Sequence, residues 1–439
     1  MEVNTVLVLG VVVIGFAAVA RRIDTTPISG PMVFVAVGLL LGSRGLGWLE
    51  SDVSNATITG LVEATLAVVL FSDAARIDLR NLRRHWALPG LLLAVGLPLA
   101  MVFGALLSMV LFGGLGWEAA LLVGVMLAPT DAALGQAVVT DRSIPVYVRQ
   151  GLNVESGLND GLAFPVFEAA VTLALVGFLD TGLSGALTDL LEKVALGALA
   201  GIVVGATCGS LLSRARRSGW TGRHWHGIAT LGVAAAAYGL AEALGGNPFI
   251  ATFAAGLAYR PSVDLPMADD VSHDVAELLT MLAFVVFGSA VLGPNLDAVG
   301  WRTLLYAVLS LTVVRGLAVA ISLLAMRVRP ATVAFIGWFG PRGIASVLYA
   351  FLLLESAGTL PATQDVVDVV MVTVALSVLL HGMTASSLAR AYGRWYSSME
   401  EEHEEMVEST AVHEHDLGRC SDAAGRAASS AATRPEGGP

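Results

Sequence analysis

Three polar stretches inside otherwise apolar sequence carry the residues that could do chemistry. The densest is 155–160 (ESGLND), with two carboxylates, an amide and a hydroxyl. On a helix, Ser156 and Asp160 share one face, and Glu155 and Asn159 share a neighbouring face. These groups are costly in an apolar helix unless they have partners. The stretch therefore favours a buried oxygen site for a cation or a proton, and a purely structural polar cluster is the alternative.

The second stretch is 127–133 (LAPTDAA), which contains Pro129, Thr130 and Asp131. Proline lacks a backbone donor and disfavours helix at the residue before it, so the helix should break there. An unwound stretch at membrane depth must line a protein or water cavity. The freed carbonyls and the Asp131 carboxylate would then form a hard oxygen site for a small cation such as Na⁺. The alternative is a simple kink in which Asp131 caps the second half of the helix.

The third stretch is 339–346 (FGPRGIAS), where Pro341 and its neighbouring glycines predict a second interruption. It carries Arg342, and a second intramembrane arginine, Arg315, lies in the preceding apolar run. Charges at this depth usually face a polar cavity or a partner. We expect Glu155 to pair with Arg315, because Asp160 must stay free to exchange ligands. Arg342 is expected to neutralise carbonyl dipoles where the two breaks cross, and the sequence does not define its partner.

Further ionisable residues are weaker candidates. Asp73 could face the mouth of a cavity, although an interfacial pair with Arg76 is an equal alternative. Glu63 lies deeper in the same apolar run and could also reach the cavity. His381 is expected to be a hydrogen-bonded packing residue, with a proton relay as the alternative.

The elements that must position these residues are transmembrane helices. Of the 439 residues, 55% are hydrophobic and 14% are charged, whereas soluble domains carry about 25% charged residues. A bilayer core needs about 20 helical residues to cross it, and apolar runs of that size recur along the chain. The composition predicts an all-α polytopic membrane protein and excludes a soluble globule, an outer-membrane barrel and, with two cysteines, a disulfide framework. No nucleotide-binding loop or metal-ligand histidine pair is present, so we expect neither an enzyme nor a cofactor.

About thirteen transmembrane helices are predicted. They cover residues 3–20, 28–46, 57–76, 88–112, 117–139, 147–177, 190–213, 226–244, 247–260, 274–292, 301–325, 331–354 and 366–389. The two interrupted spans are each fifth in a set of six, and one span joins the sets. This arrangement predicts two inverted six-helix repeats with two discontinuous crossing helices and a transport site between them.

The basic residues predict the orientation. Arginines gather in the loops after odd-numbered spans, whereas Arg44, Lys193 and Arg302 are the basic residues on the other side. Cytoplasmic loops are enriched in such residues. We therefore expect a multi-pass inner (plasma) membrane protein with its N-terminus outside and its C-terminus in the cytoplasm. Residues 397–439 are predicted to be an acidic, disordered cytoplasmic tail, and binding of a regulator by this tail is the alternative.

At these motifs the chain resembles the monovalent cation:proton antiporters of the NhaP-type branch, which is related to the sodium/proton exchangers. Thr130-Asp131 looks like the family's Thr-Asp pair in a discontinuous helix. The stretch 155–160 matches its Glu-Ser-x-x-Asn-Asp signature, and Arg342-Gly343 matches an Arg-Gly pair in the second broken helix. The likeness extends to about residue 390. One departure is Ser72-Asp73, where relatives often carry glutamate, which puts a secondary carboxylate of the site in doubt.

The resemblance implies an NhaA-like fold in a homodimer, with the transmembrane antiporter domain at 1–396. Its core domain would contain spans 88–177 and 301–389, and the remainder would form an interface domain. The resemblance also implies that Asp160 takes either the cation or the proton, and that Thr130, Asp131 and Ser156 help to ligate the ion. Asn159 belongs to the same site. It implies in addition that Glu155 and Arg315 form a structural pair.

The physical logic is competition for one carboxylate. Burial disfavours the charged form of Asp160, and a nearby cation favours it. Carrying either a proton or Na⁺ by alternating access would give exchange without ATP. Asn159 stands where electrogenic relatives have a second aspartate, and Lys193 cannot replace their core lysine, so electroneutral 1:1 exchange is expected. K⁺/H⁺ exchange is the first alternative, followed by a sodium-coupled organic-solute carrier and an ion channel. The expected partners are the lipid bilayer and a second copy of the chain, with a regulator bound by the tail as the alternative, and no nucleic acid is expected.

Overall fold

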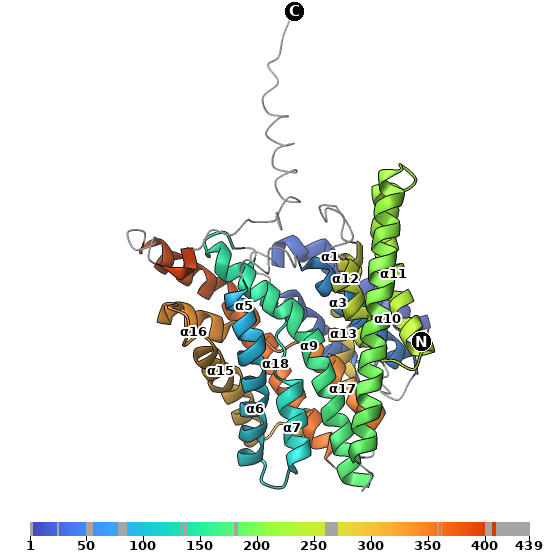
Figure 1. Cartoon of the computed structure of the whole chain (residues 1–439). Coiled ribbons are helices and arrows are strands. Elements are labelled where there is room, and N and C mark those ends of the chain that lie inside the picture. The colour runs from blue at the N-terminus through green and yellow to red at the C-terminus, as the bar shows by residue number, and fades with distance from the viewer. Residues whose placement is uncertain are drawn as a thin grey trace, which may run out of the picture.

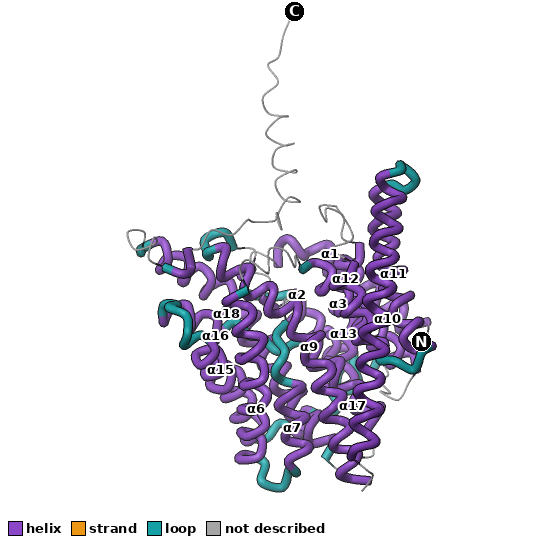
Figure 2. Tube along the Cα trace, in the orientation of Figure 1, coloured by secondary structure: helices purple, strands orange, loops and turns teal. Residues whose placement is uncertain are grey.

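The computed structural model of the chain describes residues 3–23, 26–49, 56–77, 86–131, 134–135, 138–139, 141–179, 183–259, 271–357, 360, 362–399 and 406–409. Within these ranges every regular element is a helix (Figure 2). Six of the described helices are long and apolar enough to cross a membrane, and further apolar helices are shorter. The structure is therefore an all-helical bundle, as the composition predicts.

The helices pack side by side in one bundle (Figure 1). The first part of the chain forms α1 (Val3–Ile23), α2 (Gly30–Leu41), α3 (Ala56–Arg76), α5 (Ala87–Leu91), η1 (Leu92–Gly96), α6 (Leu97–Leu111), α7 (Trp117–Met126), α9 (Val146–Leu179) and α10 (Leu183–Arg217). The second part forms α11 (Arg223–Ala243), α12 (Pro248–Tyr259), α13 (Val271–Val286), η3 (Phe287–Leu292), η4 (Leu296–Ala298), α14 (Trp301–Leu309), η5 (Ser310–Val314), α15 (Arg315–Ser322), α16 (Pro330–Trp338), α17 (Ile344–Ala357), α18 (Thr363–Ser397) and η7 (Val407–Ser409).

These helices lie at the predicted spans, with ends that differ by several residues in places. The largest extensions are at α10 and α18, which run beyond the apolar core of their sequences. The predicted span 331–354 is divided into α16 and α17, and the helix of the predicted span 117–139 stops at Met126. Of the predicted tail, residues 400–405 and 410–439 lie outside the described residues.

Among the described residues, wide helical turns (π-helices) interrupt three of the spans. The segment η1 is a π-helix that joins α5 to α6, and Pro98 follows it in the first turn of α6. Proline cannot donate the hydrogen bond that a regular helix requires at that position, which explains the wider turn. A second π-helix, η5, ends immediately before Arg315, and a third, η3, continues α13. The turn at η5 therefore sets the direction in which the intramembrane arginine leaves its helix.

Small residues bring helices into close contact. On α10, Gly197, Gly201 and Gly205 follow at intervals of four, and a Cβ at any of them would overlap the backbone of α12 or of the residue before it. Glycines at this spacing allow the backbones of membrane helices to approach closely. Gly38 on α2 and Gly288 on η3 allow the same close backbone contact between those two helices. These contacts fix helices that lie beside the central α3 and α9 without large interlocking side chains.

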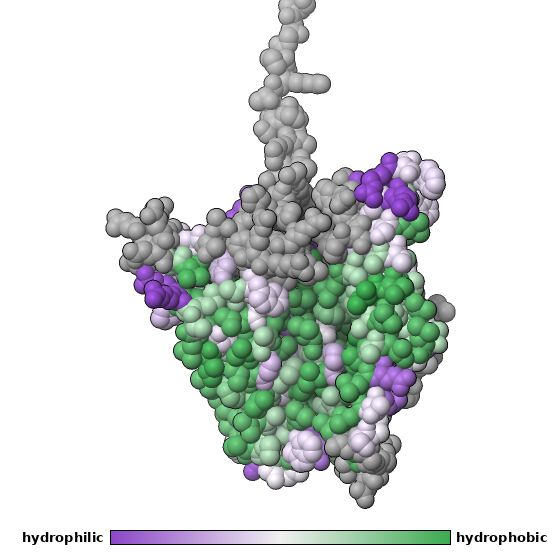
Figure 3. All heavy atoms as spheres, in the orientation of Figure 1, coloured by the Kyte–Doolittle hydropathy of each residue, from purple (hydrophilic) through white to green (hydrophobic). Residues whose placement is uncertain are grey.

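The surface has an apolar belt between two polar ends (Figure 3). Many large apolar side chains of this belt are exposed, among them Val110, Leu199 and Leu317. In water this would be unfavourable, but in a bilayer such a surface faces lipid. One polar end carries the last turn of α10, with Arg214, Arg216 and Arg217, and the hairpin of α10 and α11 projects from the body there (Figure 1). We call it the arginine-rich end.

Candidate functional site

Two interrupted helices meet at the centre of the bundle. The chain leaves helical geometry after Met126 and after Trp338, and α17 begins at Ile344. At the meeting point the backbone N–H of Asp131 donates to the carbonyl of Pro341 at 2.8 Å. The two breaks therefore support one another, as buried backbone polar groups require in a bilayer. Their positions follow from Pro129 and Pro341, which cannot continue a helix.

Asp131 caps the helix that follows the other break. Its Oδ2 accepts a hydrogen bond from the backbone N–H of Ile344, the first residue of α17, at 2.8 Å. A carboxylate at a helix N-terminus satisfies a free donor and complements the helix dipole. Gly343 makes this approach feasible, because a Cβ there would overlap the Asp131 carboxylate. The alternative of capping within its own span would involve residues next to Ala132 and Ala133, which lie outside the described residues.

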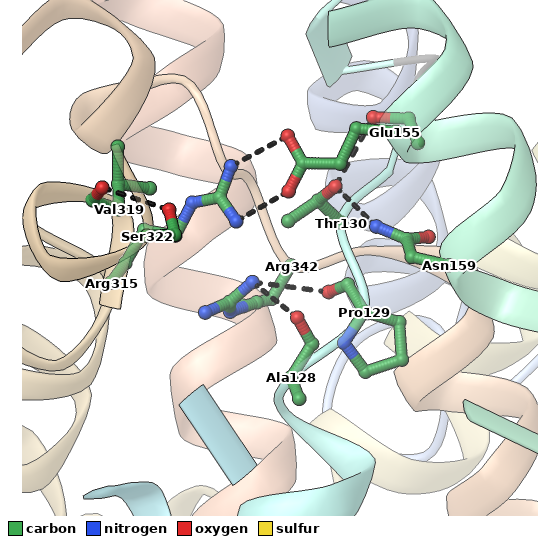
Figure 4. Close-up of polar contacts among 10 residues, drawn as sticks. Ala128, Pro129, Thr130, Glu155, Asn159, Arg315, Val319, Ser322 and Arg342 are labelled. Carbon is green, nitrogen blue, oxygen red and sulfur yellow. Dashed lines mark hydrogen bonds and ion pairs between the residues drawn. The ribbon is translucent and has the colours of Figure 1, made fainter. Parts of the chain in front are cut away.

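Arg342 binds the carbonyl groups that the first break exposes. Its side chain is fully buried, and Nη1 donates to the carbonyls of Ala128 and Pro129 at 2.8 and 3.2 Å (Figure 4). Its backbone N–H donates to Ser377 Oγ at 2.7 Å. The guanidinium thus supplies positive charge where carbonyl dipoles converge, and these carbonyls are the partner that the sequence left undefined.

Glu155 and Arg315 form a closed, buried pair. Nη1 and Nη2 of Arg315 donate to Oε1 and Oε2 of Glu155 at 2.6 and 2.8 Å, in the paired geometry seen in Figure 4. Arg315 is 1% exposed and Glu155 is 2% exposed. Two parallel charge-assisted bonds orient both groups and saturate the carboxylate. This pair connects α9 to α15 beside the crossing. Its two charges neutralise each other, so it is a structural contact.

Hydroxyl and amide groups of both elements gather next to this pair. Thr130 Oγ1 lies 3.1 Å from Ser156 Oγ and accepts a hydrogen bond from Asn159 Nδ2 at 2.6 Å (Figure 4). Asn159 Oδ1 is buried with no hydrogen-bond partner among the described residues. Thr130 therefore connects the broken stretch to the polar face of α9. The amide oxygen of Asn159 and the hydroxyl oxygens of Thr130 and Ser156 are available to a ligand.

Asp160 is a buried carboxylate that, unlike Glu155, pairs with no arginine among the described residues. It is 5% exposed, and among the described residues its Oδ1 has no hydrogen-bond partner. Its charge is opposed by those of Asp73 and Asp131, with which it interacts electrostatically. A buried carboxylate with an unsatisfied oxygen and acidic neighbours is unfavourable unless a cation or a proton compensates it. This is the chemistry expected of a group that binds either one.

Asp73 and Glu63, the two weaker carboxylate candidates, lie in different surroundings on α3. Asp73 lies on α3 near Gly157, because a Cβ on that glycine would contact its backbone oxygen and Cβ at 3.8 and 3.9 Å. Arg76, its predicted alternative partner, has Nη1 3.0 Å from His273 Nδ1. Glu63 lies ten residues earlier on α3, about 15 Å along the helix, and accepts from the hydroxyl of Tyr238 at 3.4 Å. Asp73 is therefore the carboxylate of α3 that approaches Asp160.

Three residues at the site carried no predicted role. Tyr349 donates its hydroxyl to the carbonyl of Asp160 at 2.8 Å, and Ser346 donates to the carbonyl of Met126 at 2.6 Å. Ser377 accepts from the backbone of Arg342, as described above. Each bond joins segments far apart in sequence, so local spacing gives no signal for it. Together they hold the end of α7, the middle of α9 and the first turns of α17 around the crossing.

His381 completes this support. Its Nε2 lies 2.9 Å from the carbonyl of Trp338, at the end of α16, and its Nδ1 lies 3.2 Å from Ser377 Oγ. Nδ1 also lies 3.0 Å from the carbonyl of Ser377. A neutral ring with its proton on Nε2 donates to the carbonyl of Trp338 and accepts from Ser377 Oγ, but it makes no hydrogen bond to the carbonyl of Ser377. The geometry suits the packing role predicted for this residue.

The donor set suits a weakly held cation. Within the described ranges, no group of three or more His, Cys, Asp or Glu side chains is placed to hold a metal ion. A cation beside Asp160 would instead take one or two carboxylates together with hydroxyl, amide and carbonyl oxygens. Such hard, neutral oxygen ligands favour alkali or alkaline-earth cations over transition metals.

Comparisons with known proteins agree with this geometry. The family model described as sodium/hydrogen exchanger, transmembrane, matches residues 8–391. The solved structure of the sodium proton antiporter MjNhaP1 from Methanocaldococcus jannaschii superposes with a TM-score of 0.73 at 20% identity, covering 87% of this chain and all of that one. The fold is thus shared with that protein.

Curated relatives are longer than this chain. The K(+)/H(+) antiporter NhaP2 of Shewanella sp. (strain MR-4) is 26% identical over 367 residues, which is 82% of this chain and 62% of that protein. A probable Na(+)/H(+) antiporter of Schizosaccharomyces pombe is 26% identical over 331 residues, 70% of this chain and 43% of the other. The chain therefore spans about three fifths, or less, of the length of these relatives.

Proposed function

Because the chain belongs to the sodium/hydrogen exchanger family, we propose that it is a secondary antiporter that exchanges a monovalent cation for a proton. No ATP site is needed, since the gradient of one ion drives the other. Alternating access would expose the crossing first to one side of the membrane and then to the other. The whole reaction then depends on a group that takes the two ions in turn.

Asp160 is that group, and its buried, unpartnered Oδ1 is the observation among the described residues that carries the proposal. The electrostatic interactions with Asp73 and Asp131 oppose an uncompensated charge on it. Either a proton or a cation removes this penalty, and each excludes the other because a protonated carboxyl no longer attracts the cation. Competition at one site couples the two fluxes in opposite directions.

The surrounding groups divide the remaining tasks. Thr130 and Ser156, which lie 3.1 Å apart, would supply neutral oxygens to the cation. Asp131 would add charge while capping α17. Asn159 would orient Thr130 through the bond that its amide donates. The Glu155–Arg315 pair and Arg342 would keep this frame rigid, because their charges are already occupied by each other or by carbonyl groups.

The exchange is proposed to be electroneutral, with one proton for each cation. Asp160 has an amide neighbour, Asn159, where a second carboxylate would be needed to carry another proton. Lys193 pairs with Asp189 at an exposed position on α10, so it does not act at the crossing. With one exchanging carboxylate, the loaded site has the same charge whether it holds H⁺ or a monovalent cation.

Sodium is the proposed cation, and potassium is the alternative. Relatives are named for each of them, NhaP2 for K⁺ and the Schizosaccharomyces pombe protein for Na⁺. Oxygen ligands bind both ions, and the size of the cavity during transport decides between them. We propose further that the protein works as a homodimer in the plasma membrane, with the arginine-rich end in the cytoplasm and the N-terminus outside.

Purified protein in liposomes with an internal pH dye tests this function. Addition of Na⁺, K⁺ or Li⁺ to wild type should move protons at the same rate whether the membrane voltage is clamped or free. Asp160→Asn should be inactive, and Asp189→Asn, a matched change at an exposed carboxylate, should behave as wild type. Activity with K⁺ alone would change the cation but keep the mechanism. Full activity of Asp160→Asn would contradict the site, and a voltage-dependent rate would contradict the stoichiometry.

A further inference from the structure

A short segment after α18 returns to the body of the protein. Residues 406–409 include the turn η7, and Met406 and Glu408 are buried, at 5% and 2% exposed. Ser409 Oγ lies 2.9 Å from the hydroxyl of Tyr396 in the last turns of α18. The segment thus has a defined binding place at the arginine-rich end, between the ends of α9, α16 and α18.

Glu408 contacts the start of the helix that leads to the second break. Its Oε1 accepts from the backbone N–H of Arg329 at 2.9 Å and from Thr332 Oγ1 at 2.7 Å. Arg329 occupies the cap position of α16 and provides no side-chain cap of its own. A carboxylate at this position satisfies free donors and complements the helix dipole. The cap of α16 therefore comes from a residue 79 positions away in the sequence.

Aromatic rings connect this contact to the crossing. Thr332 Oγ1 also lies 2.8 Å from the hydroxyl of Tyr392, whose ring stacks on Phe335 with centroids 4.1 Å apart. Phe335 in turn packs on Phe339 at 4.6 Å. Phe339 is the first residue of the break that continues to Arg342. The start of α16 and the crossing are thus joined by packed side chains over a helix of nine residues.

Docking of this segment has an unfavourable contribution as well as favourable ones. Glu408 Oε2 is buried, and among the described residues it has no hydrogen-bond partner. Burying one half of a carboxylate without a partner opposes docking, while the two bonds of Oε1 favour it. Opposing contributions of this kind leave a balance that a small change can shift.

We propose that residues 406–409 form a strap that docks on the N-terminus of α16 and positions the second break for transport. The docking site takes a short acidic segment of the chain's own tail, with Glu408 as its anchor. When the strap is docked, α16 is capped and the Phe339–Gly343 break is held as described. When it leaves, α16 loses its cap and the crossing binds its cation less well. The effect on transport rests on the antiport function proposed above, whereas the docking itself does not.

Thiol accessibility measures docking without any transport. In a chain with Cys208→Ser and Cys420→Ser, Met406→Cys should react slowly with a membrane-impermeant maleimide, and Ser398→Cys, at an exposed position, should react fast. Adding Glu408→Ala to Met406→Cys should accelerate the reaction by at least about tenfold, because a charge-assisted hydrogen bond is lost. Glu402→Ala, which removes a carboxylate six positions earlier in the same tail, should not. Equal rates at positions 406 and 398 with Glu408 intact, or no acceleration by Glu408→Ala, would overturn the strap.

Transport then tests whether docking matters to the site. Glu408→Ala should raise the cation concentration for half-maximal exchange by about fivefold, as expected for loss of one helix cap. Thr332→Val keeps the bond from the Arg329 N–H to Glu408, so it should raise this concentration less. The double variant should show an effect smaller than the two single effects combined, because both changes remove the bond between Thr332 and Glu408. Thr332→Ser should restore the wild-type value, since it keeps the hydroxyl. An unchanged half-maximal concentration in Glu408→Ala, when the same change accelerates labelling at position 406, would overturn the strap's influence on transport. An inactive wild type would contradict the antiport function alone.

Discussion

At the scale of single residues, the buried charges differ in how fully they are paired. Arg315 and Glu155 bind each other through two bonds, and Arg342 binds carbonyl groups of the first break. Asp160 keeps one carboxylate oxygen without a partner among the described residues. Nε of Arg315 and Nε and Nη2 of Arg342 are also buried without a partner, but each guanidinium makes two bonds that stabilise the frame. No hydrogen bond among the described residues holds the Asp160 carboxylate, which can therefore exchange ligands. This difference is what separates structural charges from the transport site.

The stability of variants should follow the same division. Arg315→Met leaves Glu155 buried and unpaired, so it should lower the free energy of unfolding by about 3–5 kcal/mol. Asp160→Asn removes a buried charge that is uncompensated in the cation-free state, so at high pH without Na⁺ it should leave stability unchanged or higher. Thermal unfolding in detergent measures both. A loss for Asp160→Asn as large as that for Arg315→Met would contradict the assignment of roles.

Helical spacing predicted which polar residues of 155–160 share a face, and it gave no signal where a contact spans the fold. Ser156 could be placed with Asp160, and Glu155 with Asn159, because residues four apart on a helix share a face. The role of Asp131 as cap of α17 could not, because Ile344 lies 213 positions away. The same holds for Tyr349 and for Glu408, which the sequence placed in a disordered tail. In each case the partner is set by how helices cross, and one sequence does not encode that locally.

At the scale of elements, the two breaks are a single structural unit. Their positions were predictable, since proline cannot continue a helix, and the described helices end close to the predicted points. What holds them together is a set of contacts between them: Asp131 with Pro341 and Ile344, and Arg342 with Ala128 and Pro129. Changes in one break should therefore disturb the other.

Gly343→Ala tests this coupling. The added Cβ would overlap the Asp131 carboxylate, so the cap of α17 would be lost and the ligand set displaced. We expect at least about a tenfold loss of exchange, comparable to misplacing a reacting group by an ångström or less. Gly232→Ala, on α11 with open space around it, is the matched control. Equal exchange rates for the two variants in liposomes would contradict the close approach of the breaks.

The packing of α10 on α12 gives a second test at this scale. Gly201→Leu would force a side chain against the backbone of Ala251, whereas Gly239→Leu on α11 would enter open space. Overpacking of this kind costs about 1–3 kcal/mol or more. The first variant should lower the melting temperature in detergent clearly, and the second should not. A similar fall for both would show that helix propensity or lipid contact, rather than close packing, explains the result.

At the scale of the whole molecule, an apolar belt separates an arginine-rich end from the opposite end. The composition and the arginine pattern predicted both features, because bilayer thickness and loop charge act on the sequence as a whole. The belt is visible in Figure 3. The sidedness of these ends, and the assembly of two copies, are proposals that follow from the pattern.

Cysteine labelling tests the orientation. In a chain without its natural cysteines, Ser398→Cys at the arginine-rich end should react with an impermeant maleimide only from the cytoplasmic side. Gly114→Cys, in the exposed turn between α6 and α7 at the opposite end, should react only from outside. Right-side-out and inside-out vesicles distinguish the two. Reversed labelling would contradict the orientation inferred from the arginines.

The central claim is that one buried carboxylate holds either a proton or a cation, and proton release on binding tests it most directly. Purified protein in weakly buffered detergent, held near the pH at which half of the sites carry a proton, would be titrated with NaCl while a pH dye reports released protons. We predict that wild type releases protons as Na⁺ binds, up to one per site as the pH is lowered, and that Asp160→Asn releases none. Sodium binding without proton release, or full release from Asp160→Asn, would contradict the account.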